Sequence, residues 1–427
     1  MKKAPSPIVS LIPIIVLVLL LSATIRTFGS DALSGGSQVS LLTTTAICIL
    51  IGMVFYKIPW KDYELAITNN IAGVATAIII LLIIGALSGI WMISGVVPTL
   101  IYYGMQIIHP SFFLASTCII CALISVMTGS SWTTIATIGI ALMGIGKAQG
   151  FEDGWIAGAI ISGAYFGDKI SPLSETTILA SSITDTPLFR HIRYMMITTV
   201  PSLVITLIIF TVAGFSHDAN NTQHIAEVAT ALNEKFHITP WLLIVPVATG
   251  ILIAKKVPSI VTLFLSTLLA AVFALIFQPD LLEEISGIAA SGFDSLFKGL
   301  MMTIYGETNL HTDNAVLTDL IATRGMSGMM NTIWLILCAM CFGGAMTASG
   351  MVGSITSIFV RFMKKTVSVV SATVCSGLFL NLTTADQYIS IILTGNMFRD
   401  IYAKKGYESC LLCRTTEDAV TVTSVLI

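Results

Sequence analysis

The chain has 427 residues, of which 55% are hydrophobic and only 10% are charged, and its formal net charge is −2. A soluble protein has about 25% charged residues, so this chain, with a mean hydropathy of +0.91, cannot cover a water-facing surface. The balanced charge and the lack of a basic stretch exclude a nucleic-acid-binding protein. Composition therefore predicts an all-α polytopic membrane protein that has the lipid bilayer as its solvent.

The first apolar run, Ile8–Ile25, is longer than a signal-peptide core and lacks a cleavage site, so we expect a retained membrane helix. Residues 1–79 are predicted to form N-terminal scaffold helices. A polar connector at 215–239 is followed by further scaffold helices and a polar loop at 240–334. Apolar stretches that could span or partly enter a membrane lie at about 8–28, 39–56, 66–90, 91–108, 194–214, 240–254, 258–277, 328–349 and 350–363.

Eight cysteines include three C-x-x-C pairs, a spacing that in a soluble protein suggests zinc or redox chemistry. Two of these pairs lie inside apolar stretches without a nearby histidine, where cysteine behaves as a small hydrophobic residue. We therefore expect the cysteines to serve packing, and we expect no cofactor.

The two halves of the chain resemble each other at a separation of 255 residues. Residues 80–97 align with 335–352 without a gap, and after one inserted residue QGFED at 149–153 aligns with KGYES at 405–409. The alignment pairs Gly89 with Gly344, Ser94 with Ser349, Gly95 with Gly350, Leu123 with Leu378, Thr128 with Thr383 and, after the insertion, Asp168 with Ser424. Repeats are common in secondary transporters, where inverted copies place the substrate at their interface. We predict two inverted structural repeats with re-entrant hairpins and discontinuous helices, at 80–214 and 335–427.

Each predicted repeat contains the pattern of a re-entrant hairpin, at 111–147 and 366–399: two apolar arms around a tip of small polar residues. Oxygen atoms at such a tip are hard ligands that suit Na⁺, whereas backbone amides at a helix start suit a carboxylate substrate. Alternatively, the hydroxyl groups only bond back to their own helices or support packing. The candidate ligands at the two tips are Thr128, Ser130, Ser131, Asn381, Thr384 and Asp386.

The stretch Gly163–Ser182, within a predicted broken helix at 154–185, carries charged residues and Pro172 inside apolar sequence. A charge at the bilayer centre costs roughly 2.5 kcal/mol or more, and non-helical backbone at that depth must be buried in protein or line a polar cavity. The stretch therefore predicts a discontinuous helix at a binding site. The alternative is a short loop between two helices. Candidate binding residues here are Asp168, Ser171, Ser174 and Glu175, with Lys169 as a charge partner or substrate clamp.

Glu175 is explained equally well as a carboxylate that caps the start of the next helix. In the second half, RTTEDAVTVTSVLI is the counterpart of the broken helix. The candidate residues of this segment are Thr423 and Ser424 as binding residues, and Arg414, Glu417 and Asp418 as charge partners. Arg414 beside two acids is also explained as a structural ion pair at a helix entrance.

Exchange of Na⁺ for H⁺ needs a carboxylate that holds either ion but not both. Burial raises the pKa of a carboxyl group toward neutrality, so a proton competes with the cation near physiological pH. Asp168 is favoured as this residue because it precedes the predicted break, where the negative end of the helix dipole also attracts a cation. Asp386, at the second tip and opposite Ser131 in the alignment, is the second predicted Na⁺ ligand.

Three motifs together closely resemble the NhaC-type sodium/proton antiporter family of the ion transporter superfamily: TGSSWTTIATIGIALMGIG, GAYFGDKISPLSETT and RTTEDAVTVTSVLI. The resemblance runs over most of the chain and is densest at 85–190 and 375–427. It implies exchange of Na⁺ for H⁺ by alternating access, a location in the bacterial inner membrane with several membrane passes, and a homodimer formed through a scaffold domain.

The chain departs from the family pattern at its end, where the family continues with a Pro-Trp-Asn-type break and a further helix, so we expect a truncated second site. Members of the family also differ in substrate. The alternative function is therefore a Na⁺- or H⁺-coupled exchanger of small organic acids, such as malate and lactate, or of amino acids, with Lys169 or Arg414 holding a carboxylate group. An enzyme is not expected because no nucleophile–base pair or HExxH motif is present. Nothing suggests the ring of like charges that lines a channel.

Overall fold

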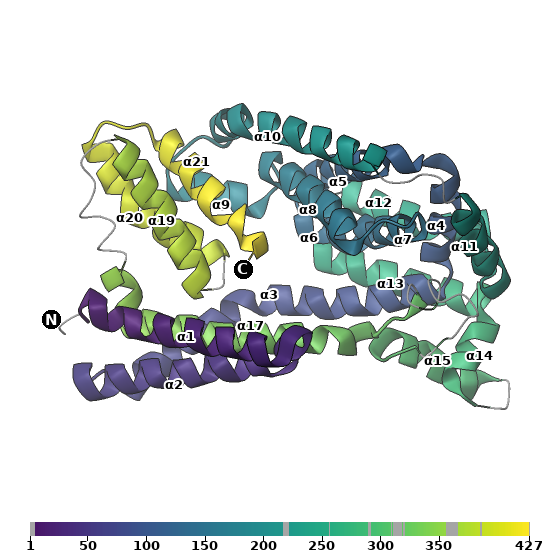
Figure 1. Ribbon diagram of the computed structural model, residues 1–427, viewed down its shortest axis with the longest axis horizontal. Coiled ribbons are helices and arrows are strands. Elements are labelled where there is room, and N and C mark those ends of the chain that lie inside the picture. Colours follow the sequence, from purple (N-terminus) through teal and green to yellow (C-terminus); the bar gives the residue numbers. More distant parts are fainter. Residues whose placement is uncertain are drawn as a thin grey trace. The chain divides into compact units, whose positions relative to one another are not determined.

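The computed structural model describes residues 5–216, 222–255, 257–288, 292–308, 310, 318, 321–355, 366–384 and 387–426. Within these ranges every regular element is a helix, which confirms the all-α prediction (Figure 1). Helices satisfy their backbone hydrogen bonds internally, as a chain in hydrocarbon must.

Seven helices among the described residues are long and apolar enough to cross a membrane, which confirms a polytopic membrane protein. An eighth span results if the pair Ala229–Lys235 and Pro240–Ala254, bent by 94°, is one broken span. The seven are Pro7–Phe28, Gly36–Tyr56, Trp60–Ile93, Pro110–Thr128, Leu188–Ser216, Ser259–Phe277 and Gly325–Ala348.

The chain forms two compact units, each assembled from segments that are distant in sequence. The first unit comprises Met1–Ile78, Thr176–Tyr194 and Met330–Ile427. Its elements are α1 (Pro7–Phe28), η1 (Gly29–Ser34), α2 (Gly36–Tyr56), the first part of α3 (Trp60–Ile93), most of α9 (Glu175–Ile183), the start of α10 (Leu188–Ser216), α17 (Met330–Ala348), α19 (Thr366–Thr384), α20 (Gln387–Lys404), α21 (Ser409–Val420) and η6 (Thr423–Leu426).

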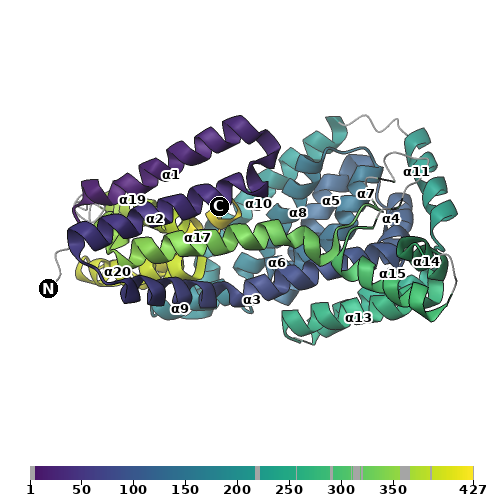
Figure 2. The ribbon, with the colours of Figure 1, turned by 90° about the horizontal axis from the view of Figure 1, so that it is seen from below.

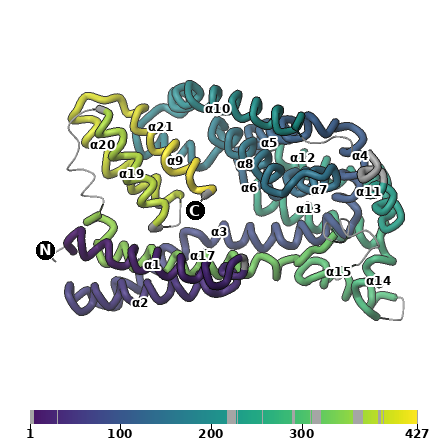
Figure 3. Tube along the Cα trace, viewed as in Figure 1, coloured from purple at the N-terminus to yellow at the C-terminus, as the bar shows by residue number. Residues whose placement is uncertain are grey.

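Two groups of helices make up this first unit. α1, α2 and α17 lie side by side in both ribbon views, around a buried cluster that includes Cys48, Tyr63 and Phe342 (Figures 1 and 2). α19, α20 and α21 pack on one another around Phe398 and Tyr402 (Figure 3). Burying apolar side chains between helices leaves the outward faces, which are also apolar, for lipid.

The second unit comprises Ile79–Glu175 and Met195–Met329. It contains the C-terminal parts of α3, from Ile79, and of α10, from Met195. Its other elements are α4 (Val96–Ile107), η2 (Pro110–Phe112), α5 (Phe113–Thr128), α6 (Ser131–Thr134), η3 (Ile135–Gly139), α7 (Ile140–Ala148), α8 (Asp153–Ile170), α11 (Thr222–Lys235), η4 (Pro240–Leu243), α12 (Ile244–Ala254), α13 (Ser259–Phe277), α14 (Pro279–Ser286), α15 (Phe293–Tyr305) and η5 (Gly325–Met329).

α5 packs along α8, and this is the most extensive helix contact of the second unit. Small residues make the close approach possible, because a Cβ atom at Gly163 or Gly167 of α8 would collide with the carbonyl oxygen of Cys118 or Ala122 on α5. Such small-residue faces are typical of helix pairs in membranes, where backbone proximity replaces the hydrophobic effect as the source of packing energy.

Two element boundaries differ from the sequence prediction. The apolar stretches at 66–90 and 91–108 divide at Ser94–Gly95, because Gly95 has a left-handed φ of 84° that ends the preceding helix. The polar connector at 215–239 contains α11. The predicted division of the chain into scaffold segments and repeats stays a prediction.

Candidate functional site

α8 ends at Ile170 and α9 begins at Glu175, so the stretch singled out in the sequence contains a helix break at Ser171–Ser174. Ser171 is extended, with φ −77° and ψ 130°. This conformation is expected before Pro172, because the proline ring disfavours a helical residue in front of it. Asp168 therefore lies in the last turn of a helix that stops where charge and proline predict.

The break is held against the tip that joins α5 to α6. The hydroxyl of Ser171 donates to the carbonyl oxygen of Val126 at 2.8 Å and accepts from the backbone N–H of Leu173 at 3.2 Å. Gly129 at the tip has φ 66°, and a Cβ atom there would lie 2.6 Å from the Leu173 backbone. A glycine is therefore needed both for the left-handed turn and for the close approach.

The carboxyl group of Asp168 faces this tip and is buried, with 8% of the residue exposed. Its Oδ2 accepts hydrogen bonds from the Ser131 hydroxyl at 2.9 Å and the Ser131 backbone N–H at 3.2 Å. Ser174, in the break, is buried and lies near the same carboxyl group. Oδ1 is buried and accepts no hydrogen bond from a described residue. A buried carboxylate oxygen without a donor is costly unless a proton or a cation neutralises it.

The other tip hydroxyl groups are used within the tip. Thr128 donates toward the carbonyl oxygens of Ser125 and Ser130 and accepts from the Ser130 N–H at 3.1 Å. The Ser130 hydroxyl caps the following helix by accepting from the Thr133 N–H at 3.2 Å. These bonds account for both side chains through local structure, and their assignment as ion ligands stays a prediction.

Lys169 is buried, with 7% exposed, whereas Glu175 is exposed at the start of α9 and interacts electrostatically with Asp168. The position of Glu175 fits the predicted carboxylate at a helix N-terminus. A direct part in binding for either residue stays a prediction.

In the first unit, Asn381 of α19 reaches the end of α21. Its Nδ2 donates to the carbonyl oxygen of Val420 at 2.9 Å and to the Thr423 hydroxyl at 3.3 Å. The Ser424 hydroxyl bonds to Oε1 of Gln387, the first residue of α20, at 3.1 Å. These predicted residues therefore meet. Asp386 and the side chain of Thr384 lie outside the described residues.

The Arg414 cluster lies on α21. The Nε atom of Arg414 lies 3.3 Å from Oδ2 of Asp418, one helical turn later, and its guanidinium group covers the Tyr194 ring at 5.2 Å from the centroid. Glu417 is fully buried. The ion pair that the sequence suggested is present, and a cation–π contact fixes it further.

Two hydrogen-bonded pairs recur in the two units. The Ser131–Asp168 and Gln387–Ser424 bonds each join residues 37 apart, and the Ser125 and Asn381 side chains each donate to a carbonyl oxygen 39 residues on. All of these positions are related by 256 residues, so the inserted residue precedes Ser125. The pairing of Thr128 with Thr383 and of Ser131 with Asp386, which uses a separation of 255 residues, is therefore wrong by one residue.

Backbone geometry supports the same register. Gly150 and Gly406, which are 256 residues apart, have φ 83° and 71°, whereas Gly95 and Gly350, which precede the inserted residue and are 255 apart, have φ 84° and 70°. The segments from α5 to α8 and from α19 to η6 thus share these hydrogen bonds and left-handed glycines, whereas their relation as inverted repeats stays a prediction. Gln387 was missed because an amide at a helix start has no distinctive sequence signal.

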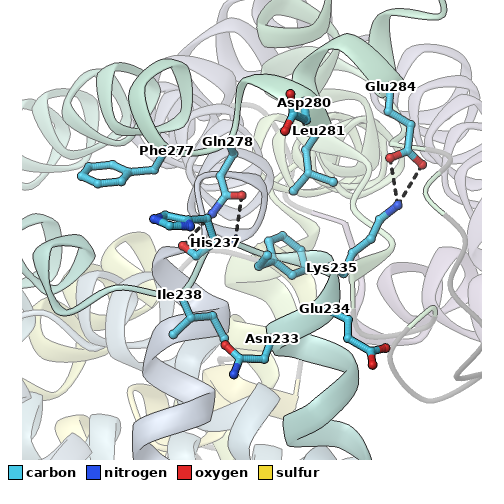
Figure 4. A pocket seen from close by; sticks show the side chains of 11 residues that line it. Asn233, Glu234, Lys235, His237, Ile238, Phe277, Gln278, Asp280, Leu281 and Glu284 are labelled. Atoms are coloured by element: carbon cyan, nitrogen blue, oxygen red, sulfur yellow. Dashed lines mark hydrogen bonds and ion pairs between the residues drawn. The ribbon is translucent and has the colours of Figure 1, made fainter.

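A polar pocket of about 500 Å³ lies elsewhere in the second unit (Figure 4). Gln278 donates to and accepts from the backbone of His237, both at 3.1 Å, and Lys235 pairs with both carboxylate oxygens of Glu284 at 2.8 and 2.9 Å. The His237 ring stacks on Phe277 at 6.2 Å. These contacts join α11 to the α13–α14 corner, and the sequence analysis placed no functional residue there.

An all-helical membrane chain with a buried acid beside a helix break has the features of a secondary transporter. A family model described as "Na+/H+ antiporter family" matches residues 3–179 and 163–427. The chain belongs to the Na⁺/H⁺ antiporter family, which confirms the resemblance found in its motifs. It is a multi-pass membrane protein, and in bacteria such proteins lie in the inner membrane.

Three relatives illustrate the range of this family. The Na⁺/H⁺ antiporter NhaC of Bacillus subtilis is 35% identical over 90% of this chain and 83% of its own length. The malate-2H⁺/Na⁺-lactate antiporter of the same organism is 36% identical over 91% of this chain and 80% of its own. The arginine/ornithine antiporter ArcD of Halobacterium salinarum is 30% identical over 100% of this chain and 84% of its own.

Proposed function

We propose that the protein exchanges Na⁺ for H⁺ across the membrane by alternating access, with Asp168 holding one ion at a time. The observation that carries this proposal is the buried Oδ1 of Asp168, which accepts no hydrogen bond from the described residues. Family membership supports the choice of ions.

Burial of the Asp168 carboxyl group explains why binding of one ion leads to exchange and not to uncoupled movement of Na⁺ or H⁺. An ionised carboxylate inside the membrane is costly, and either Na⁺ or H⁺ on Oδ1 removes most of that cost. The protein therefore changes its accessible side easily when Asp168 carries one of the two ions and with difficulty when it carries neither. Inward movement of protons is thereby coupled to outward movement of sodium ions.

Exchange of small organic acids or amino acids is the second candidate, because two relatives of similar identity are named for such substrates. Lys169, buried beside Asp168, is the residue of the second unit that would hold a substrate carboxylate in that case. Asp386 as a second Na⁺ ligand and a homodimeric assembly, both expected from the sequence or the resemblance, belong to the proposal as well.

Everted membrane vesicles that contain the protein test the two candidates. With a proton gradient established, Na⁺ alone should dissipate it, and vesicles with Asp168→Asn should not respond. If dissipation requires malate, lactate, arginine or ornithine together with Na⁺, the second candidate holds. Asp386→Asn in the same assay tests the second ligand, and light scattering of the purified protein tests the dimer.

A further inference from the structure

Ser131 presents two donors to a single oxygen atom of Asp168. Its hydroxyl group and its backbone N–H both donate to Oδ2, at 2.9 and 3.2 Å. Ser131 is itself nearly fully buried, with 2% exposed. It begins the continuous helical segment 131–148, which is formed by α6, η3 and α7. Asp168 thus accepts at the start of that segment, where the helix dipole also favours negative charge.

The two donors make the carboxylate oxygens unequal. The in-plane lone pairs of Oδ2 are both occupied, so a proton or a cation could bind that oxygen only by displacing a donor. Oδ1 accepts no hydrogen bond from the described part of the chain and stays available. Hydrogen bonds to a charged carboxylate also stabilise the charged form. They therefore weaken the binding of any ion that neutralises it.

We propose that Ser131 is a positioning residue and not a ligand of the transported ion. It holds Oδ2, directs Na⁺ and H⁺ to the same atom, Oδ1, and lowers the affinity for both so that each can leave. The inference rests on the proposed exchange function, and it assigns to Ser131 a role that a hydroxyl ligand of Na⁺ would not have.

Few other charges act on Asp168 from its surroundings. Glu175 begins α9 after the break, and Lys169 follows Asp168 on α8. α5 carries no Asp, Glu, Lys or Arg, and the segment 131–148 carries only Lys147, which lies 3.3 Å from Asp153 at the far end. The groups that stabilise the ionised carboxylate are therefore mainly hydrogen-bond donors: the hydroxyl of Ser174 in the break, and the hydroxyl and backbone N–H of Ser131.

The test measures the KM for Na⁺ as a function of pH in vesicles with wild type, Ser131→Ala and Ser131→Thr. In Ser131→Ala the lost donor makes the proton bind about tenfold more tightly, so the activity profile moves up by about one pH unit. At alkaline pH, where protons no longer compete, its KM for Na⁺ falls or stays equal. Ser131→Thr keeps the hydroxyl and the wild-type profile.

Thr137→Val is the matched control, because the Thr137 hydroxyl lies on the same segment and donates only to the backbone carbonyl oxygens of Thr133 and Thr134, at 2.7 and 3.4 Å. It should leave the pH profile in place. If Ser131→Ala does not insert, Ser131→Cys takes its place, because its thiol is a weaker donor than the serine hydroxyl and should move the pH profile in the same direction by a smaller amount. Proton release on adding Na⁺ to this purified variant can then be measured in place of transport.

A higher KM for Na⁺ at alkaline pH with an unmoved pH profile would make Ser131 an ion ligand and overturn the inference. Identical behaviour of Ser131→Ala and wild type would overturn it as well. In both cases wild-type exchange persists, and the proposed function stands. A wild-type protein without Na⁺-dependent proton movement would instead refute the function itself.

Discussion

The segments from α5 to α8 and from α19 to η6 share hydrogen bonds between corresponding positions but differ in the side chain at the position of Asp168. In the first, a serine at a helix start bonds to the acid Asp168. In the second, Gln387 bonds to the neutral Ser424 with the same separation of 37 residues. The shared backbone therefore does not make a titratable site. A titratable site needs an acidic side chain at this position, and of the two corresponding residues only Asp168 is an acid, whereas Ser424 is not.

The two segments also differ in which helix carries the glycines that allow close packing. α8 approaches α5 through Gly163 and Gly167, whereas the positions 256 residues later on the second segment hold Ala419 and Thr423. There the glycine is on α19: a Cβ atom at Gly377 would lie 3.1 Å from the Val420 side chain. The helix that carries the acid is thus packed through close backbone contact at these two glycines.

The largest effect should come from Asp168→Asn, which keeps the shape of the side chain but removes the charge that exchange requires. We expect Na⁺-driven proton movement in vesicles to fall to background while the protein still inserts. Asp153→Asn, at the opposite end of α8, is the control and should stay active. Wild-type exchange by Asp168→Asn would remove this residue from the mechanism.

The KM for Na⁺ should rise as pH falls, by about tenfold for each pH unit, over the range in which protons occupy the site. The sign follows from competition: a bound proton must leave before Na⁺ can bind Oδ1. Initial rates at several Na⁺ concentrations and pH values measure it. A KM independent of pH, with only the maximal rate changing, would show that the two ions use different sites.

Gly163→Ala or Gly167→Ala should destabilise the protein by about 1–3 kcal/mol, because the new methyl group meets a carbonyl oxygen of α5. Gly158→Ala on the same helix is the matched control, since no described atom lies within 4 Å of its added Cβ. Thermal unfolding in detergent compares the variants. Equal unfolding temperatures would show that α5 and α8 are less closely packed than described.

Ser424→Ala should have the smallest effect. It removes the hydrogen bond to Gln387, worth about 1 kcal/mol or less, and touches no titratable group in this contact. The unfolding temperature should drop slightly, and the pH profile of exchange should not move. A shifted profile would mean that the second segment shares in proton binding, and the contrast between the two segments would then be wrong.

The helix break and the importance of Asp168 could be predicted from the sequence, because a charge and Pro172 inside apolar sequence leave few physical solutions. Which tip hydroxyl meets Asp168 could not. Thr128, Ser130 and Ser131 are chemically alike, and the left-handed turn at Gly129 and the packing of the tip on the break decide that only Ser131 among them bonds to Asp168.

The register of the repeat needed the structure for a similar reason. Identity between the halves is low, and small residues match by chance, so the inserted residue was placed too late in the sequence alignment. The recurring bonds from Ser125 and Asn381 correct its place, because a side chain that reaches across to a neighbouring helix fixes the register of both. Asp386 consequently corresponds to Ser130 and not to Ser131.

Proton release on binding tests the central claim most directly, because it needs no transport. Na⁺ is added to the purified protein in weakly buffered detergent solution at a pH where the site is partly protonated, and the pH change is recorded. The wild type should release protons with a saturable dependence on Na⁺, and Asp168→Asn should release none. Equal release by the two proteins would contradict competition between Na⁺ and H⁺ at Asp168.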